Sequence, residues 1–246
     1  MDKTSIKAVI LAAGKGTRLQ TEGNTLPKVM RMAAGKPLLA YVLSALDFIP
    51  VKDRIIVVGY KKESVIEAFP EYAFAEQKEQ LGTGHAVMAA YSLLDGYNGQ
   101  LLVCCGDMPL IKRETYRALI DTHSAEGNVC TILSGTSELS LPYGRILRDE
   151  EGNFLGMVED KDATPEQKKI KELNSGVYVF DAAALLSVLS ELRSDNSQGE
   201  YYLTDAPLLL QKKGLKIGVC YRELGYQIIG VNTPEQLRQT EEILLK

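Results

Sequence analysis

A glycine-rich basic loop follows the first apolar run of the chain. The run, residues 8–12, stops before Gly14, and the basic residues Lys15, Arg18 and Lys28 follow it. Glycine lets the backbone approach an anion closely, its N–H groups can converge on that anion, and the basic side chains add full positive charges. The pattern predicts a phosphate-binding turn after a buried strand. An ordinary strand-to-helix turn with solvated bases is the alternative.

The spacing of this loop differs from the common nucleotide-binding loops. It contains neither GxxxxGK[ST] nor a complete GxGxxG. The second predicted strand runs into Gly59-Tyr60-Lys61 rather than ending at an acidic residue, which disfavours a dinucleotide-binding oxidoreductase.

The segment LAAGKGTRL, residues 11–19, followed by LPK at residues 26–28, resembles the signature of sugar-1-phosphate nucleotidylyltransferases. Later segments are similar to the uridyltransferase domain of the bacterial bifunctional N-acetylglucosamine-1-phosphate uridyltransferases, and the resemblance covers nearly the whole chain. It implies a Mg²⁺-dependent enzyme that converts UTP and N-acetylglucosamine 1-phosphate to UDP-N-acetylglucosamine, a precursor for cell wall biosynthesis, and pyrophosphate. In such a reaction an oxygen of the sugar phosphate attacks the α-phosphorus, so cations and oriented N–H groups matter more than a protein nucleophile.

The resemblance implies a role for each part of the first loop. Arg18 and Lys28 stand at the catalytic positions that neutralise the triphosphate. The nucleotide-binding positions of the same segment are Leu11, Ala12, Ala13, Gly14, Gly16 and Thr17.

Two residues far apart in the sequence match the metal ligands of the family. Asp107 follows the apolar residues 101–105, and Asn232 lies in IIGVNT. Oxygen ligands suit Mg²⁺, which proteins often hold with only one or two groups besides phosphates and water. Taken singly, Asp107 could cap the next helix and Asn232 could be a turn residue; the pair together favours a magnesium site.

A second glycine-rich turn, residues 76–84, matches the base pocket of the family. Gln77 and the Gly82 backbone would read the uracil edge, with Thr83 nearby, whereas His85 is assigned to the first turn of the following helix. The sugar-binding candidates by the same correspondence are Gly144, Glu159 and Asn174. The run 196–205 resembles the uridyltransferase form, and residues 200–202 are expected to shape the wall of the sugar pocket.

Composition and charge restrict the other classes of function. Hydrophobic residues at 45% and charged residues at 24% are ordinary for a soluble globular protein. The net charge of −4 disfavours a nucleic-acid partner, and the four cysteines and two histidines form no zinc pattern. The first apolar run is too short for a signal peptide or a membrane span, so no membrane partner and a cytoplasmic location are expected. The sequence does not indicate an oligomeric state.

Alternating apolar and amphipathic runs position these residues. They predict an α/β fold with βαβ units, a mostly parallel central sheet and an inserted β-hairpin at residues 143–160. The resemblance implies that this is a Rossmann-like three-layer sandwich with a sugar-binding hairpin lobe, the nucleotide-diphospho-sugar transferase fold. Because ligands bind beyond the carboxyl ends of parallel strands, the loops after Leu11, Glu76 and Cys105 should converge. Helix-start patterns of cap, Pro and capping-box Gln occur at Thr164 and Thr233. The predicted strands are 6–12, 54–59, 72–76, 100–105, 129–135, 172–181 and 216–223, and the predicted helices are 37–49, 63–69, 82–94, 112–125, 182–192 and the segment after Thr233.

The chain also departs from the family pattern. Residues 19–25 make a longer insertion before Lys28, and Cys105 stands where an aromatic residue is more usual. No hexapeptide repeat is present, so residues 1–246 are expected to form a single nucleotidyltransferase domain without the left-handed β-helix acetyltransferase domain. Two alternatives for function remain: a transferase for another pair, such as UTP or dTTP with glucose 1-phosphate, and a nucleotide-sugar-binding module without catalysis.

Overall fold

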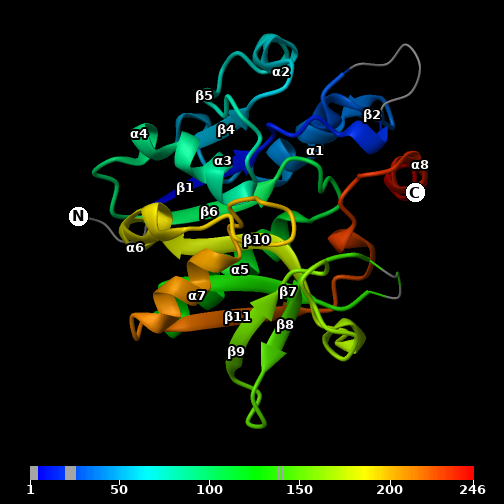
Figure 1. Ribbon diagram of the computed structural model, residues 1–246. Helices are drawn as coiled ribbons and strands as arrows, with labels where there is room; N and C mark the ends of the chain where they lie inside the picture. Colours follow the sequence, from blue (N-terminus) through cyan, green and yellow to red (C-terminus); the bar gives the residue numbers. More distant parts are fainter. Residues whose placement is uncertain (1–4, 20–25, 138, 140) are drawn as a thin grey trace.

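The computed structural model describes residues 5–19, 26–137, 139 and 141–246. Its centre is a mixed sheet with the strand order β11-β7-β10-β6-β1-β4-β5 (Figure 1). β10 runs antiparallel to both of its neighbours, whereas the other neighbouring pairs in this order are parallel. These strands are β1 (Ile6–Leu11), β4 (Arg54–Val58), β5 (Ala73–Glu76), β6 (Gln100–Cys105), β7 (Cys130–Gly135), β10 (Leu173–Asp181) and β11 (Ile217–Arg222).

Helices cover both faces of this sheet, so its strands are apolar on both sides. Along β1, Ala8 and Ile10 belong to one core cluster and Val9 to the other, as alternation of side chains across a sheet requires. The first cluster includes side chains of α1, α2 and α5, and the second includes side chains of α3, α6 and α7. The helices are α1 (Leu38–Ala45), α2 (Lys62–Ala68), α3 (Thr83–Ala89), α4 (Tyr91–Leu94), α5 (Arg113–Glu126), α6 (Ala182–Val188), α7 (Asp205–Lys212) and α8 (Pro234–Leu244). The predicted three-layer sandwich is confirmed.

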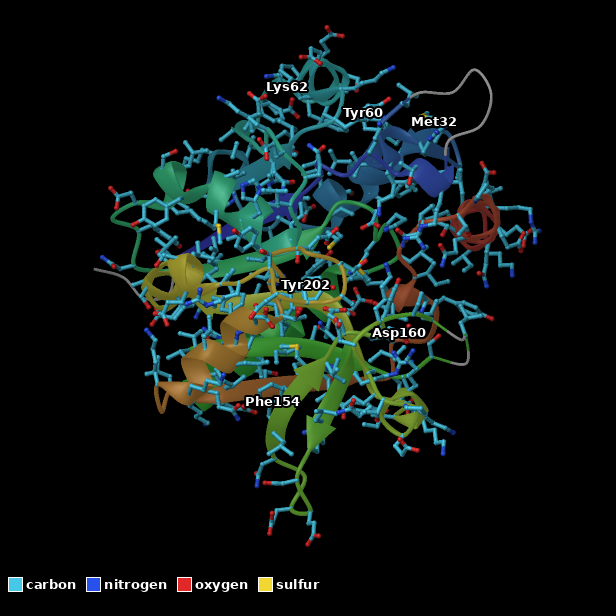
Figure 2. All side chains as sticks on the ribbon, in the orientation of Figure 1. Met32, Tyr60, Lys62, Phe154, Asp160 and Tyr202 are labelled. Atoms are coloured by element: carbon cyan, nitrogen blue, oxygen red, sulfur yellow. The ribbon has the colours of Figure 1, made fainter. Side chains whose placement is uncertain are left out.

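A hairpin lobe extends from the edge of this sandwich. β8 (Arg145–Arg148) and β9 (Phe154–Val158) pair in antiparallel orientation, and Gly152 at their turn has φ +83°. One register pair, Leu173 with Arg145, joins β8 to β10. Figure 2 shows Phe154 and Asp160 on this lobe, Tyr60 and Lys62 at the opposite end of the molecule, and Tyr202 between the two. The predicted inserted lobe is therefore present.

Four predictions about helices are wrong. The helix predicted at 182–192 is an α-helix only over Ala182–Val188, and a 3₁₀ turn, Leu189–Glu191, follows it. The helix expected to run from the second glycine turn to Leu94 is broken at Ala90 into α3 and α4. Thr164 and Gln167 exchange the hydrogen bonds of a capping box at 2.9 and 3.2 Å, yet only a 3₁₀ turn, Gln167–Lys169, follows because residues 168–172 carry no helical apolar periodicity. The helix after Pro37 ends at Ala45, four residues early. At Thr233 the same box does start an α-helix, α8.

The sequence analysis also did not predict α7. This helix follows a segment without regular structure and supplies Ala206 and Leu210 to the second core cluster. Within the described ranges, each helix is too short or too polar to cross a membrane.

Candidate active site

Two adjoining cavities lie beyond the carboxyl ends of β1, β5 and β6. The first has a volume of about 240 Å³ and extends toward the hairpin lobe, and the second has a volume of about 230 Å³ and extends toward the glycine turns. Leu11, Thr83, Cys105 and Asp107 line both cavities. The loops after Leu11, Glu76 and Cys105 therefore converge, as predicted, and we call the first cavity the lobe cavity and the second the loop cavity.

The first glycine loop forms one wall of the loop cavity. Ala12 and Ala13 are buried, and their backbone is fixed to the β4 end by bonds from Ala12 N to Val57 O at 2.8 Å and from Tyr60 N to Ala13 O at 3.2 Å. Leu11, Ala12, Ala13 and Gly14 all line this cavity.

Gly16 allows this loop to pack against the residue that reaches into the cavity. It has φ +65°, and a Cβ there would lie 2.7 Å from Lys28 Cβ. Lys28 begins a 3₁₀ turn, Lys28–Met30, and lines the loop cavity.

Arg18 and Thr17 are not brought to either cavity. Both are exposed in the 3₁₀ turn Thr17–Leu19. The structure thus separates the two positively charged residues that were expected at the catalytic positions: Lys28 lies inside the cleft and Arg18 lies outside it. Residues 20–25, which include most of the predicted longer insertion, lie outside the described residues.

Lys28 joins the two predicted metal ligands. Its Nζ donates a hydrogen bond to Asp107 Oδ2 and another, of 2.9 Å, to Asn232 Oδ1. The ligands are held together because Val231 N donates to Asp107 O at 2.9 Å and Asn232 Nδ2 donates to Gly230 O at 3.1 Å. A carboxylate oxygen and an amide oxygen thus converge on one cation, here an ammonium group.

This oxygen pair fits a divalent metal ion of the hard type. Mg²⁺ takes oxygen ligands and keeps several waters or phosphate oxygens, so two protein ligands suffice. In the described portion of the chain, there is no cluster of three or more His, Cys, Asp and Glu side chains that could hold a metal by themselves. Any metal between Asp107 and Asn232 would need further ligands from phosphates and water.

The second glycine turn holds Gln77 at the other wall of the loop cavity. Gln77 is only 3% exposed, and its Nε2 donates to Gly82 O at 3.0 Å and lies 3.2 Å from His85 Nδ1. Gly82 has φ +106°, and a Cβ there would lie 2.6 Å from Tyr201 O, so only glycine fits. Thr83 Oγ1 accepts a hydrogen bond from Leu203 N at 3.0 Å, which fixes this hydroxyl between the two cavities.

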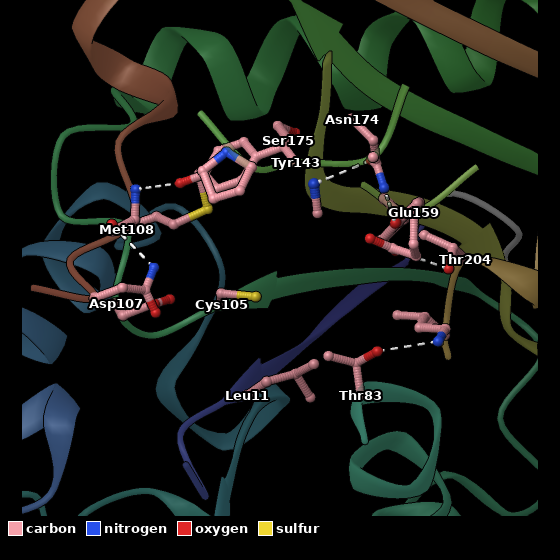
Figure 3. A pocket seen from close by; sticks show the side chains of 17 residues that line it. Leu11, Thr83, Cys105, Asp107, Met108, Tyr143, Glu159, Asn174, Ser175 and Thr204 are labelled. Atoms are coloured by element: carbon pink, nitrogen blue, oxygen red, sulfur yellow. Dashed lines mark hydrogen bonds between the residues drawn. The ribbon is translucent and has the colours of Figure 1, made fainter. Parts of the chain in front are cut away.

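The three predicted sugar residues meet in the lobe cavity (Figure 3). Asn174 N donates to Gly144 O at 2.8 Å, and Asn174 Nδ2 donates to Tyr178 Oη at 2.7 Å. A Cβ on Gly144 would lie 3.5 Å from Glu159 Oε2, so glycine at this position leaves room beside the carboxylate. Gly144, Glu159 and Asn174 therefore form a single polar surface.

Glu159 is a partly buried carboxylate. Thr204 Oγ1 donates a hydrogen bond of 3.0 Å to Glu159 Oε1. Burial raises the pKa of Glu159, and the hydrogen bond from Thr204 only partly offsets this effect.

The sequence analysis missed several residues that line the lobe cavity. Tyr143 Oη accepts a hydrogen bond from Gly230 N at 2.7 Å and so connects the lobe to the loop that carries Asn232. Thr204 also lines this cavity, whereas Glu200, expected in the sugar wall, lines the loop cavity instead. A lone Tyr or Thr in a loop carries no sequence signal that would have identified it.

Cys105 lies where the two cavities join. Burial is the main cause that raises the pKa of its thiol to about 12, and the nearby Asp107 carboxylate adds to the effect. A thiol with such a pKa remains protonated at neutral pH and is a poor nucleophile.

Known proteins with similar sequences match almost the whole of this chain. The chain is 46% identical over 238 residues to Bifunctional protein GlmU of Caldanaerobacter subterraneus subsp. tengcongensis, covering 96% of this chain and 51% of the relative. It is 41% identical over 237 residues to Bifunctional protein GlmU of Geobacter metallireducens, covering 95% of this chain and 49% of the relative. The chain thus spans about half the length of these curated relatives.

Solved structures share the fold. A UDP-glucose pyrophosphorylase complexed with UDP-glucose superimposes with a TM-score of 0.78 at 20% sequence identity, covering 98% of this chain and 99% of the other. A putative glucose-1-phosphate thymidylyltransferase from Bacillus anthracis gives a TM-score of 0.74 at 17% identity, with coverage of 97% and 95%. The nucleotide-diphospho-sugar transferase fold expected from the sequence is confirmed.

The family is defined by a match to most of the chain. Residues 8–205 match the MobA-like NTP transferase domain, and this range contains both glycine turns, Lys28 and Asp107. The chain belongs to the MobA-like NTP transferase domain family.

Proposed function

We propose that this protein is a nucleotidyltransferase that converts UTP and N-acetylglucosamine 1-phosphate to UDP-N-acetylglucosamine and pyrophosphate. The observation that carries the proposal is the junction of two cavities at Asp107, with Lys28 beside it. One cavity has the features of a nucleotide site and the other those of a sugar site, so the reacting phosphates of both substrates would meet at the junction.

Hydrogen-bond accounting in the loop cavity supports a base with a uracil-type edge. Gly82 O already accepts from Gln77 Nε2 at 3.0 Å and from Ala86 N at 3.1 Å, so both of its lone pairs are used. Among the described residues, Gly82 N–H has no acceptor and Gln77 Oε1 has no donor. The turn therefore offers one donor and one acceptor, which complement O4 and N3–H of uracil.

The Gly82 N–H donor and the Gln77 Oε1 acceptor do not complement cytosine, which presents an acceptor at N3 and a donor at N4. A base that leaves these buried polar groups without partners loses their hydrogen-bond energy, so the turn discriminates against CTP. Thymine shares the N3–H and O4 edge of uracil, so this turn alone does not separate UTP from dTTP.

The polar surface of the lobe cavity suits a sugar with several hydroxyl groups. Glu159 offers a carboxylate acceptor and Asn174 an amide, while Gly144 leaves open space next to them. Charged and amide groups placed in this way orient a sugar by hydrogen bonds.

Lys28 and the first glycine loop would carry the electrostatics of the reaction. In our proposal, an oxygen of the sugar phosphate attacks the α-phosphorus in line, and pyrophosphate leaves toward the loop of residues 11–17. Lys28 would then exchange Asp107 and Asn232 for phosphate oxygens and stabilise the charge that develops on them. Mg²⁺ held by Asp107 and Asn232 would offset the charge of the phosphates when bound. Arg18 would have to move inward to contribute.

Residues 1–246 act in this proposal as one nucleotidyltransferase domain in the cytoplasm, where its substrates are available. The experiment that tests it is pyrophosphate release with Mg²⁺, in which UTP, dTTP, CTP and ATP are each paired with N-acetylglucosamine 1-phosphate and with glucose 1-phosphate. The proposal predicts the highest kcat/KM for UTP with the N-acetylated sugar. A higher value for another pair would overturn the assigned substrates, and no release with any pair would overturn the activity.

A further inference from the structure

The orientation of the Gln77 amide is set by its chemistry. Its Nε2 and Oε1 have nearly the same size, so shape alone does not distinguish the two ways in which the amide could lie. Its partner is Gly82 O, a carbonyl that can only accept, and the distance between them is 3.0 Å. The group that faces Gly82 must therefore be the donor, Nε2, and Oε1 is directed elsewhere.

The same nitrogen also lies 3.2 Å from His85 Nδ1. Because Nε2 of Gln77 only donates, His85 Nδ1 must accept, which requires a neutral imidazole with its proton on Nε2. The ring of His85 lies beside that of Tyr201, with the ring centroids 6.2 Å apart at an interplanar angle of 33°. Both hydrogens of the Gln77 amide thus have an acceptor.

We propose that His85 is a positioning residue that sets pyrimidine selectivity by fixing the Gln77 amide with Oε1 toward the base. The inference deepens the proposed function and rests on it for the location of the base. His85 itself does not line the loop cavity, whereas Gln77 does, so the effect acts through the glutamine.

Loss of the His85 acceptor has a defined consequence. One of the two amide hydrogens would lose its partner, and Gly82 O would hold the amide alone. The amide would then be held through one hydrogen instead of two, so Oε1 would face N3–H of uracil for a smaller fraction of the time and the preference for uracil over cytosine would weaken. One hydrogen bond of ordinary strength contributes about a factor of ten, so selectivity should fall but not vanish.

Asparagine and leucine at position 85 form a matched pair for the test. Both side chains branch at Cγ, and asparagine carries an oxygen at the place that Nδ1 occupies in histidine, whereas leucine carries a methyl group. His85→Asn should therefore keep the acceptor, and His85→Leu should remove it with a similar volume. Thermal unfolding of both variants verifies that each one folds.

Binding of UDP and CDP to the full chain, measured by calorimetry, reports selectivity without turnover. We expect wild type and His85→Asn to share the same ratio of UDP to CDP affinity within about threefold, and His85→Leu to lower that ratio about tenfold, chiefly through weaker UDP binding. An unchanged ratio in His85→Leu, or an equal loss in both variants, would overturn the role of His85.

The tautomer of His85 provides a second test on the unmodified protein. The chain has only two histidines, His85 and His123, so ¹⁵N spectra of the imidazole nitrogens contain two sets of signals, and His85→Leu identifies one. At a pH where the ring is neutral, we expect the proton of His85 on Nε2. A proton on Nδ1 would contradict the inference whatever the variants do.

These measurements separate the inference from the proposed function. UDP selectivity that depends on His85 without any pyrophosphate release would sustain the positioning role and remove the proposed activity. Pyrophosphate release with UTP, together with an unaltered ratio of UDP to CDP affinity in His85→Leu, would support the proposed activity and contradict the positioning role of His85.

Discussion

Lys28 Nζ and Asn232 Oδ1 lie 2.9 Å apart, although 204 residues separate them in the sequence. The same ammonium contacts Asp107, so one cation bridges the end of β6 and the loop before α8. In the proposed reaction this position belongs to the metal, and Lys28 belongs on the phosphates.

Removing the charge of Lys28 should therefore have opposite effects on metal binding and on turnover. In Lys28→Met, we expect Mn²⁺ to bind without nucleotide about tenfold more tightly, because no ammonium competes for Asp107 and Asn232. The value of kcat should fall by about 10²–10³, because one phosphate-stabilising charge is lost. Electron paramagnetic resonance of free Mn²⁺ measures the metal affinity, and a pyrophosphate-release assay measures kcat.

Lys36→Met is the matched control for this experiment. Lys36 is exposed, its Nζ lies 5.9 Å from the centroid of the Tyr41 ring, and it lines neither cavity. Its substitution should leave both Mn²⁺ affinity and turnover at wild-type values. Weaker Mn²⁺ binding in Lys28→Met would contradict competition between the ammonium and the metal.

Gly16→Ala should displace Lys28 from the cleft. The new Cβ would lie 2.7 Å from Lys28 Cβ, and the φ of +65° adds a backbone cost of about 1–2 kcal/mol. Gly152→Ala at the tip of the hairpin is the control, because it has φ +83° but no atom within 4 Å of the added Cβ. Urea unfolding should show the larger loss for Gly16→Ala, and only that variant should lose turnover, by about tenfold or more. Equal losses of stability and turnover in both variants would mean that backbone strain causes them, and would contradict the displacement of Lys28.

Glu159→Gln should weaken binding of the sugar phosphate and raise the thermal stability of the protein. A neutral amide accepts a weaker hydrogen bond from the sugar, so the KM for the sugar phosphate should rise about tenfold. The thermal stability should increase at neutral pH, because burial raises the pKa of Glu159 and so disfavours its ionised form in the folded state.

The pH dependence of this stability follows from the sign of the shift. A raised pKa in the folded state gives a contribution that is complete below the unfolded pKa, which is about 4.3 for glutamate, and is lost as pH rises through the folded pKa. The Tm of Glu159→Gln minus that of wild type should therefore be smallest below about pH 4 and increase toward neutral pH. A difference that is constant from pH 3 to 8 would show that Glu159 is not destabilised by burial.

Much of the fold could be predicted because it depends on local pattern. The apolar run of β6 was predicted residue for residue, and the turn around Gly152 revealed the hairpin lobe. The resemblance carried by LAAGKGTRL and LPK is confirmed by the family match. The extent of α7 and the break at Ala90 depend on packing against distant elements, which a periodic pattern does not report.

The site could be predicted in part for the same reason. Asp107 and Gln77 follow β6 and β5, and the carboxyl ends of such parallel strands meet at one edge of the sheet. The sugar surface lies at the same edge because the antiparallel strand β10 begins there and pairs with β8. The exposed position of Arg18 and the contact of His85 in α3 with Gln77 depend on side-chain directions that the sequence does not specify. Glu200 faces the loop cavity because its segment folds over Gly82, a long-range contact without a local signal.

The measurement that tests the central claim most directly is pyrophosphate release from UTP and N-acetylglucosamine 1-phosphate by wild type and by Asp107→Asn. Asp107 lines both cavities and contacts Lys28, so the proposal requires it at the reacting phosphates. We predict rapid release by the wild-type protein and a kcat lower by about 10²–10³ in the folded variant. No release by wild type, or equal turnover by Asp107→Asn, would contradict the proposal that the two substrates meet at this residue.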